Sequence, residues 1–261
     1  MKAVITDIHD TKLAVLKEQI ISTGIKPKLT IVSVGDDPAS QIYMRNKVKL
    51  LGDAGVEVQR LHMNVATQSQ LDDIARESQC PLLFQLPLPD GLEAPDLPKH
   101  LDADAFGSEA LGKLVLGQAD LLPCTVQAVF DIVDNRLGCE SYKGLKVAIV
   151  GRSVIVGKPL AIEMINRQAT VTTFNSRSDL DIDWGKYDVV IVATGFHGVV
   201  NSSMFKKGQL VIDVGITRHN GKIVGDVKHD CESSAEITPV PGGVGRLTVL
   251  NLLANTVALT R

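Results

Sequence analysis

Short apolar runs rich in β-branched residues alternate with helix-sized stretches along most of the chain. Such runs are typical of parallel strands that are buried on both faces, so the pattern predicts an α/β fold. Glycine, proline or polar turn residues follow these runs and limit them to strand length. We expect strands at 28–34, 57–63 and 82–85, and then at 145–150, 169–174, 188–194 and 209–214.

The stretches between the apolar runs predict the helices. We expect one helix over 41–53 with Ser40 as its N-cap, behind a turn that includes Asp36 and Asp37. Another lies between the second and third strands, and further helices are expected over 125–137 and 245–259. The sequence His-Asn-Gly at 219–221 predicts a small hairpin.

The strands fall into two groups and predict two units. The first is an α/β unit of about 120 residues, and the second starts after Pro123. Neither an internal repeat nor a low-complexity linker separates the groups. We therefore expect the two units to pack closely, with a cleft between them.

Composition narrows the class of protein. The chain has 261 residues, of which 44% are hydrophobic and 22% charged, as in an ordinary soluble globular protein. A net charge of -3 gives no basic footprint for nucleic acid. No apolar run approaches the roughly 18 residues of a membrane span. Acidic residues interrupt the apolar stretch that an N-terminal signal peptide needs. We expect a cytoplasmic protein that binds neither nucleic acid nor membranes.

Cysteines and histidines give no pattern of a cross-linked or metal-binding protein. Cys80, Cys124, Cys139 and Cys231 are widely scattered and form no C-x-x-C pair. A disulfide framework or a zinc site needs clustered ligands, and the six histidines show no H-x-x-x-H spacing. We expect reduced thiols and no structural metal.

A dinucleotide site is predicted where strand 145–150 runs into the string GRSVIVGKP at 151–159. A pyrophosphate needs backbone amides at a helix N-terminus, with glycine where the phosphate comes close. The spacing of Gly151 and Gly157 differs from G-x-G-x-x-G, so an ordinary glycine-bearing turn stays an alternative. A Walker loop is excluded because Arg152 stands where it needs glycine and Pro159 where it needs Ser or Thr.

The residues after strand 169–174 favour NADP over NAD. An NAD site usually places an acid there to bind the ribose hydroxyls. This chain has Asn175, Ser176 and Arg177, and its first acid is Asp179. Together with Arg152 in the glycine turn, Arg177 suits a 2′-phosphate. The alternative is that Arg177 is only a solvated surface charge.

Several polar residues suggest a reactive site, although none is decisive by itself. Tyr43 and Lys47 lie four residues apart on one face of the first expected helix. Gln85 ends the third expected strand, at the sheet edge where ligand-binding groups gather. Asp102 and Asp104 follow, and both suit a simple turn equally well.

Taken together, the motifs resemble one family. They occur in its order from about residue 28 onward: GDDPASQIYMRNK (35–47), QLPLP (85–89), LPCT (122–125), GRSVIVGKP (151–159), VIDVGI (211–216), VGDV (224–227) and TPVPGGVG (238–245). The chain is similar to the bifunctional methylenetetrahydrofolate dehydrogenase/cyclohydrolase (FolD) family. QLPLP and PVPGGVG are its most specific strings.

The resemblance implies a two-domain NADP-dependent enzyme of one-carbon metabolism that serves purine biosynthesis and acts as a homodimer. A folate-binding catalytic domain over 1–122, completed by the C-terminal helix 245–261, would face a Rossmann-like domain over 123–244. The enzyme would oxidise 5,10-methylenetetrahydrofolate and then hydrolyse the methenyl product to 10-formyltetrahydrofolate.

The resemblance also assigns roles to residues. Lys47 would be the central catalytic residue, with a pKa kept low beside the neutral amide of Gln85. Tyr43 would stack near the aminobenzoate and Asp104 would hold the pterin edge. A loop of Pro241, Gly242 and Gly243 would close over the folate. The expected cofactor-binding residues are Gly151, Arg152, Ser153, Gly157, Ser176, Arg177 and Ile216.

Some positions depart from the family pattern. Ala105 and Arg246 replace a usual glycine and a usual proline, residues 107–110 differ, and the stretch between Pro89 and Asp102 is short. An alanine at positive φ costs about 1–2 kcal/mol. The alternatives are therefore a monofunctional dehydrogenase, a shikimate-dehydrogenase-like oxidoreductase and a non-catalytic folate- or NADP-binding relative.

Overall fold

The computed structural model describes residues 1–35, 38–138, 142–229 and 235–260, without the side chains of 38–43. The chain forms two compact units. The five-strand unit comprises Met1–His9, Leu114–Gln118 and Thr125–Thr248. The three-strand unit comprises Asp10–Lys113, Ala119–Cys124 and Val249–Arg261.

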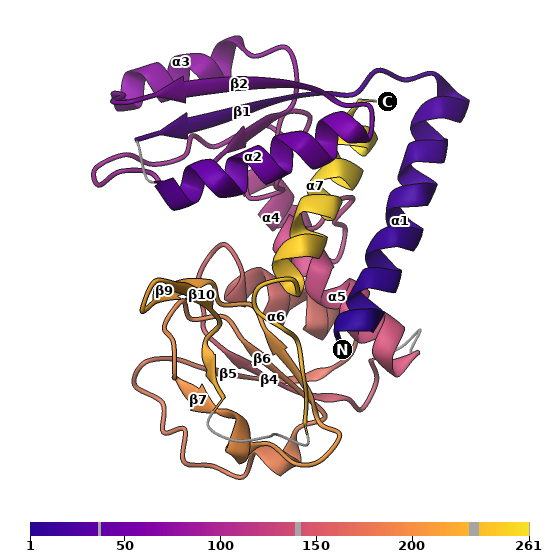
Figure 1. Cartoon of the computed structure of the whole chain (residues 1–261), viewed down its shortest axis with the longest axis vertical. Coiled ribbons are helices and arrows are strands. Elements are labelled where there is room, and N and C mark those ends of the chain that lie inside the picture. The colour runs from indigo at the N-terminus through magenta and orange to yellow at the C-terminus, as the bar shows by residue number, and fades with distance from the viewer. Residues whose placement is uncertain (36–37, 139–141, 230–234, 261) are drawn as a thin grey trace. The chain divides into compact units, whose positions relative to one another are not determined.

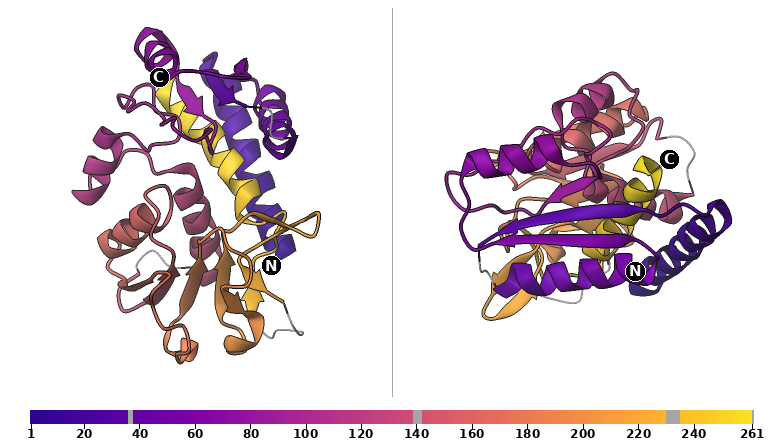
Figure 2. Two further views of the ribbon diagram at one scale, coloured as in Figure 1. Left: turned by 90° about the vertical axis from the view of Figure 1, so that its left-hand side faces the viewer. Right: turned by 90° about the horizontal axis from the view of Figure 1, so that it is seen from above.

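The three-strand unit is built on a parallel sheet in the order β2-β1-β3. Its strands are β1 (Lys28–Val34), β2 (Glu57–Met63) and β3 (Leu82–Phe84). The helices α2 (Pro38–Asp53) and α3 (Gln68–Glu77) cover opposite faces of this sheet (Figure 1, Figure 2). The central strand is buried on both faces over Leu29–Ser33, and Leu29, Ile31 and Val32 are completely buried.

The five-strand unit contains a parallel sheet in the order β12-β8-β6-β4-β5. Its strands are β4 (Lys146–Val150), β5 (Thr170–Phe174), β6 (Val189–Val192), β8 (Leu210–Asp213) and β12 (Glu236–Ile237). The chain leaves β4 for β5 on one side and then returns to β6 on the other. This reversal is the topological switch point at which Rossmann-like folds bind their ligands.

The remaining helices and the short strands complete the described part of the chain. They are α1 (Lys2–Thr23), α4 (Ser108–Val115), α5 (Cys124–Leu137), α6 (Gly157–Asn166), α7 (Val244–Leu259), the 3₁₀ turns Trp184–Lys186 and Ser202–Met204, and the short strands β7 (Val200–Asn201), β9 (Thr217–His219), β10 (Lys222–Val224) and β11 (Val227–Lys228). The predicted hairpin is confirmed, because β9 and β10 pair antiparallel. Its turn residues Asn220 and Gly221 both have positive φ, at 50° and 76°.

The predicted strands are all present, with ends that agree within about two residues. The N-cap assignment was wrong, because α2 begins at Pro38 and Ser40 lies inside the helix. Proline suits the first turn of a helix, where its fixed φ fits and no amide is missed. The 22-residue helix α1 was not predicted.

Helices α1 and α7 contact each other through side chains in each unit. In the five-strand unit, Arg246 donates to Thr6 Oγ1 and to His9 Nδ1, each at 3.1 Å. In the three-strand unit, Lys12 Nζ donates to Asn251 Oδ1 at 2.7 Å. Arg246, which replaces a usual proline, thus fixes the first turn of α7 to α1.

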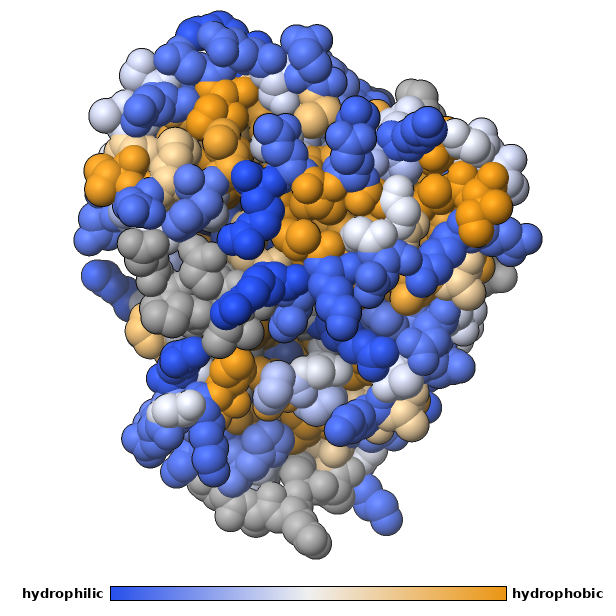
Figure 3. Space-filling view, turned by 45° about the horizontal axis from the view of Figure 1, so that its top comes forward, coloured by the Kyte–Doolittle hydropathy of each residue, from blue (hydrophilic) through white to orange (hydrophobic). Residues whose placement is uncertain are grey.

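The surface mixes polar and apolar groups. On the face drawn in Figure 3, hydrophobic residues lie in small groups separated by hydrophilic ones. Among the described helices, none is long and apolar enough to cross a bilayer.

Candidate functional site

Lys47 is a buried amine that contacts the end of a neighbouring strand. It lies on α2 and is only 6% exposed. Its Nζ donates a hydrogen bond to Gln85 Oε1 at 2.9 Å. Gln85 directly follows β3, and its backbone N–H still donates to Val32 of β1 at 2.8 Å. The sheet therefore fixes the amide that contacts the lysine.

The orientation of the Gln85 amide is set locally. Its Nε2 donates to the Leu86 carbonyl at 2.6 Å, which leaves Oε1 as the acceptor for Lys47. Burial lowers the pKa of Lys47, while the nearby Asp104 carboxylate and then the Cys124 thiol oppose this change. The expected pairing and the low lysine pKa are both present, and burial is the main cause of the latter.

Asp104 reaches Lys47 because the segment before it runs beside β3. The Leu82 N–H donates to Leu101 O at 2.7 Å, and Ala103 N–H donates to Leu82 O at 3.2 Å. Asp104 Oδ1 then accepts a hydrogen bond from the Cys124 N–H at 3.4 Å. A carboxylate, an amine and an amide thus gather at one edge of the three-strand sheet.

Asp102 is used inside its own loop. It is 4% exposed, and its Oδ2 accepts a hydrogen bond from the Gly107 N–H at 2.6 Å. Burial raises the pKa of Asp102 to about 6, and the Asp104 charge adds to this effect.

The departure at Ala105 has the backbone conformation that the family glycine suggested. Ala105 has a φ of 56° and is 2% exposed. A Cβ in this left-handed region crowds its own backbone. The loop that presents Asp104 is therefore strained by its own sequence.

Asn255 was missed by the sequence analysis. Its Nδ2 donates to Ala103 O and to Leu122 O, both at 3.1 Å, so that α7 holds the segments on each side of Asp104. The side chain is 6% exposed. A buried amide requires hydrogen-bond partners, and an asparagine among the apolar residues of this helix was the signal that could have found it.

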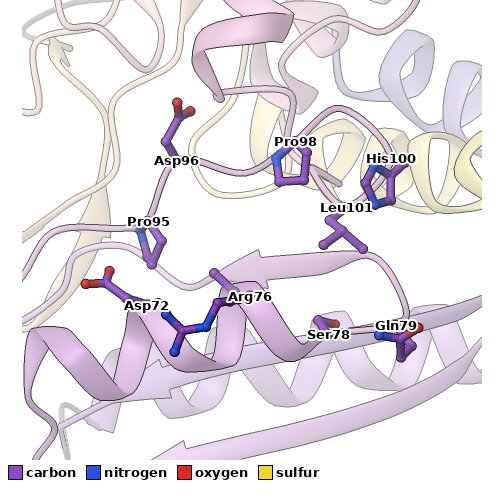
Figure 4. Close-up of a pocket in the computed structure, with 10 residues that line it drawn as sticks. Asp72, Arg76, Ser78, Gln79, Pro95, Asp96, Pro98, His100 and Leu101 are labelled. Atoms are coloured by element: carbon purple, nitrogen blue, oxygen red, sulfur yellow. The ribbon is translucent and has the colours of Figure 1, made fainter.

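Two of the cavities in the three-strand unit are lined in part by the segment 94–104, which leads to Asp104. One of about 190 Å³ includes Asp104 and Asp102 in its lining. The other, of about 560 Å³, lies between α3 and the segment 95–101 (Figure 4). It contains none of the predicted site residues, and its Arg76 is paired with Asp73. The chemistry of Lys47 and Gln85, rather than cavity volume, therefore identifies the candidate site.

The other residues predicted to contact folate are Tyr43 and the loop of Pro241, Gly242 and Gly243. Tyr43 lies one turn before Lys47 in α2, and its side chain is outside the described part of the structure. Pro241, Gly242 and Gly243 form the loop directly before α7 and belong to the five-strand unit. Their contact with folate stays a prediction.

The glycine turn after β4 requires its glycines. Gly151 has a φ of 119°, and a Cβ there would lie 2.1 Å from the carbonyl oxygen of Ala193. Gly157 begins α6, and a Cβ there would lie 2.3 Å from Gly151 O. The two glycines therefore allow a tight turn that ends at the N-terminus of α6. Free backbone N–H groups at such a helix N-terminus are what a pyrophosphate needs.

Ser153 braces this turn. Its Oγ accepts hydrogen bonds from the Val156 N–H at 3.2 Å and the Gly157 N–H at 3.4 Å. A hydroxyl that accepts in this way keeps its own proton to donate to a ligand. Arg152 beside it is exposed.

The turn after β5 presents hydroxyl and cationic groups. Asn175 Oδ1 accepts from the Arg177 N–H at 2.9 Å, and Ser178 Oγ accepts from the Asn175 N–H at 3.0 Å. Ser176 and Arg177 are exposed. The first acid, Asp179, instead accepts a local hydrogen bond from the Asp181 N–H at 2.9 Å. These residues fit a dinucleotide that bears a 2′-phosphate.

Ile216 follows β8 and is 56% exposed. A Cβ on Gly245 would lie 3.3 Å from Ile216 Cδ1, so that this apolar side chain adjoins the start of α7.

The described cysteines are free thiols. Cys80 and Cys124 are free, while Cys139 and Cys231 lie outside the described residues. Within the described ranges, His, Cys, Asp and Glu side chains form no group of three that could hold a metal ion.

Comparison with protein families covers most of the chain. Residues 2–104 match the family model described as tetrahydrofolate dehydrogenase/cyclohydrolase, catalytic domain. Residues 123–261 match the NAD(P)-binding domain of the same family.

Whole-chain comparisons agree. The bifunctional protein FolD 2 of Lactobacillus johnsonii is 39% identical over 98% of this chain and 95% of its own length. The crystal structure of the bifunctional enzyme FolD from Campylobacter jejuni is 34% identical, with a TM-score of 0.86 over 99% of this chain and 96% of that one.

A further solved structure is the Trypanosoma brucei methylenetetrahydrofolate dehydrogenase-cyclohydrolase, complexed with NADP and an inhibitor. It is 30% identical, with a TM-score of 0.82 over 99% of this chain and 95% of that one. The two family domains, the relatives along the whole length and the shared structure lead to one conclusion. The chain belongs to the tetrahydrofolate dehydrogenase/cyclohydrolase family.

Proposed function

We propose that the protein oxidises 5,10-methylenetetrahydrofolate with NADP and hydrolyses the 5,10-methenyl product to 10-formyltetrahydrofolate. The observation that carries the proposal is the hydrogen bond from buried Lys47 to Gln85, inside the part of the chain that matches the catalytic domain. Relatives named as bifunctional enzymes support both steps.

The dehydrogenase step needs positioning above all. NADP, when bound, accepts the hydride that leaves the methylene bridge of the substrate. The positive charge left behind is stabilised by the nitrogens of the substrate itself. The protein therefore has to align the two molecules and exclude competing reactions.

The cyclohydrolase step needs a group that exchanges protons near neutral pH. Water adds to the methenyl carbon and loses both of its protons, one of which passes to a ring nitrogen as the bond between that nitrogen and the carbon breaks, while the other is released. A lysine whose pKa is lowered by burial can handle these protons. Gln85 holds the Lys47 amine without the charge that a carboxylate would add.

We assign the remaining roles on the same basis. Tyr43 stacks near the aminobenzoate, Asp104 holds the pterin edge, and the loop of Pro241, Gly242 and Gly243 contacts the folate. The cofactor-binding residues are Gly151, Arg152, Ser153, Gly157, Ser176, Arg177 and Ile216. We also propose that NADP is preferred over NAD, because exposed Arg177 replaces an acidic ribose partner.

The domain limits and the setting of the enzyme are part of the proposal. We assign 1–122 together with 245–261 to the folate-binding domain, and 123–244 to the NADP-binding domain. The enzyme acts as a homodimer in the cytoplasm, where its product supplies purine biosynthesis. Light scattering at micromolar concentration tests the dimer, and a strictly monomeric protein would remove that assignment.

A single assay tests the function. Purified protein is mixed with methylenetetrahydrofolate and NADP, and methenyl absorbance and NADPH are followed together. We expect NADPH to form while methenyltetrahydrofolate stays low, because it is hydrolysed. If methenyltetrahydrofolate instead accumulated and disappeared no faster than it hydrolyses without enzyme, the protein would be a monofunctional dehydrogenase. The absence of both products would leave a non-catalytic binding protein, and NAD in place of NADP should give the slower reaction.

A further inference from the structure

Two aspartates lie together under the carboxyl edge of the five-strand sheet. Asp213 ends β8 and Asp226 lies between β10 and β11, and they are 1% and 0% exposed. The Asp226 N–H donates to Asp213 Oδ1 at 2.9 Å, and the Val227 N–H donates to Asp213 Oδ2 at 3.0 Å. Asp213 therefore fixes the segment to which Asp226 belongs.

Asp226 in turn holds the loop that follows β6. Its Oδ2 accepts three hydrogen bonds, from the Thr194 N–H at 2.5 Å, the Thr194 hydroxyl at 2.9 Å and the Gly195 N–H at 3.0 Å. Donors alone surround this oxygen, which suits an ionised carboxylate.

The second carboxylate oxygen of Asp226, Oδ1, accepts no such hydrogen bonds from the described residues. Over residues 1–35, 38–138, 142–229 and 235–260, Asp226 Oδ1 has no hydrogen-bond partner, and the side chain joins no ion pair. It faces the backbone of Gly215, where a Cβ would lie 1.9 Å from Oδ1. Buried polar atoms without a partner are uncommon and call for an explanation.

The loop that Asp226 holds lies at the switch point of the sheet. Gly151, after β4, is pressed against Ala193, after β6, because a Cβ on Gly151 would lie 2.1 Å from Ala193 O. A Cβ on Gly195, in contrast, would meet no atom within 4 Å, so that this side of the loop is open.

The direction of a bound dinucleotide follows from the topology. Groups suited to the 2′-phosphate follow β5, and the glycine turn suited to the pyrophosphate follows β4. Since β6 is the next strand in the sheet, the nicotinamide half belongs above the end of β6. Asp226 lies beneath that place.

Resting on the proposed NADP-dependent function, we propose that Asp226 is a positioning residue for the nicotinamide. It holds Thr194 and Gly195 in place, and its negative charge favours the oxidised, positively charged ring over the neutral reduced ring. Asp226 joins no ion pair within the described part of the chain, and a buried anion acts over a longer range than one in water because its surroundings screen it less. The site therefore binds NADP⁺ more tightly than NADPH, which favours release of the reduced cofactor.

Binding without folate tests this role. NADP⁺ and NADPH are titrated separately against the full-length protein by calorimetry. Asp226→Asn can keep an acceptor for Thr194 and Gly195 while it removes the charge. We expect it to weaken NADP⁺ by about tenfold and NADPH by less than about threefold. Asp213→Asn is the control, because this neighbour is equally buried but, among the described residues, its carboxylate accepts no hydrogen bond from Thr194 or Gly195. It should change both affinities by the same factor.

A second variant keeps the test sharp if Asp226→Asn folds poorly. Gly195→Ala strains the turn, because Gly195 has a φ of 74°, but leaves the carboxylate intact. It should weaken both forms of the cofactor equally. No effect from Gly195→Ala, or equal weakening of both forms by Asp226→Asn, would overturn the proposal. If the unmutated protein bound neither form, the proposed function itself would fail instead.

Discussion

Lys47 shows how a single side chain acquires chemistry from its position. At 6% exposure, its amine loses most of its hydration, and its pKa falls because the charged form is the one that water stabilises. Gln85 then supplies an acceptor without a charge. The sequence motifs were sufficient to predict this pair. They could not show that Cys124 lies beside it, because that contact depends on how the loop after β3 folds back.

Replacing Lys47 by methionine should abolish methenyl hydrolysis and leave NADP binding intact. Methionine has a similar volume and a good helix propensity, so α2 should persist. The loss of the donor to Gln85 should cost about 1 kcal/mol of stability. The measurement is the hydrolysis rate on preformed methenyltetrahydrofolate, with calorimetric NADP binding as the control. Hydrolysis near the unmutated rate would show that Lys47 is only a buried structural amine.

Replacing Gln85 by glutamate should move the pH optimum of hydrolysis upward. The new carboxylate would lie at hydrogen-bond distance from the Lys47 amine, where an opposite charge raises the lysine pKa. Rates are measured across pH for both single variants and the double variant. In the Lys47→Met background, the Gln85 change should add little, since residues that act as one unit are not additive. If the effects of the two substitutions on the hydrolysis rate were additive in the double variant, Gln85 would act independently of Lys47.

Replacing Ala105 by glycine should stabilise the protein by up to about 1 kcal/mol. The φ of 56° strains alanine but not glycine. Part of the gain is offset by the greater freedom of glycine in the unfolded chain. Urea unfolding measures the change, and Ala103→Gly, in the same loop but without a positive φ, is the matched control. If Ala105→Gly destabilised the protein as much as Ala103→Gly does, the backbone strain at Ala105 would be negligible.

At the level of elements, strands were more predictable than helices. Each strand of the two main sheets except the short β12 was expected, since buried parallel strands are continuous apolar runs. Helix α1 was missed because its buried face is sparse: Ile5, His9, Leu16 and Ile20 are buried, whereas Val15 and Ile21 are exposed. A histidine inside the stripe and apolar residues outside it obscure the helical period.

The partners of an element are harder to predict than its limits. Helix α7 was expected over nearly its observed length, and the resemblance assigned it to the folate-binding domain. Its contact with the loop before Asp104 depends on one amide, that of Asn255. A sequence pattern shows that such a residue is polar, but not which carbonyl it meets across 152 positions of the chain.

The contact between α1 and α7 can be tested at Arg246. Arg246→Met keeps much of the side-chain volume but removes the donors to Thr6 and His9. We expect a loss of about 1–2 kcal/mol in the free energy of unfolding. Amide hydrogen exchange should also become faster in the first turns of α1. Arg246→Lys is the control, because it keeps the charge and can retain one hydrogen bond. Unchanged exchange in α1 would show that the contact adds nothing.

For the whole molecule, buried carboxyl groups set a pH dependence of stability. Burial raises the pKa of Asp102 and of Asp213 to about 6 from the ordinary 3.8. The folded state therefore binds protons more tightly than the unfolded state. The stability that these groups contribute is complete below about pH 4 and is lost as the pH rises through about 6.

The double variant Asp102→Asn/Asp213→Asn should lack this dependence. Asparagine at 102 can keep an acceptor for the Gly107 N–H, whereas asparagine at 213 keeps only one of the two oxygens that accept backbone N–H groups. Urea unfolding between pH 4 and 8, compared with the unmutated protein, measures the difference. The unmutated protein should lose stability relative to the variant as the pH rises. Parallel curves over the whole range would show that neither carboxyl group titrates as expected.

The division of the chain also sets the order in which its parts can be completed during translation. The five-strand unit has all its segments once residue 248 has been made. The three-strand unit begins at Asp10 but still lacks Val249–Arg261, which includes the amide that holds Ala103 and Leu122. Until those residues have been made, the loop that bears Asp104 lacks the hydrogen bond from Asn255. The unit that contains the glycine turn thus has all its segments first, whereas the unit that contains Lys47 is begun early and completed later.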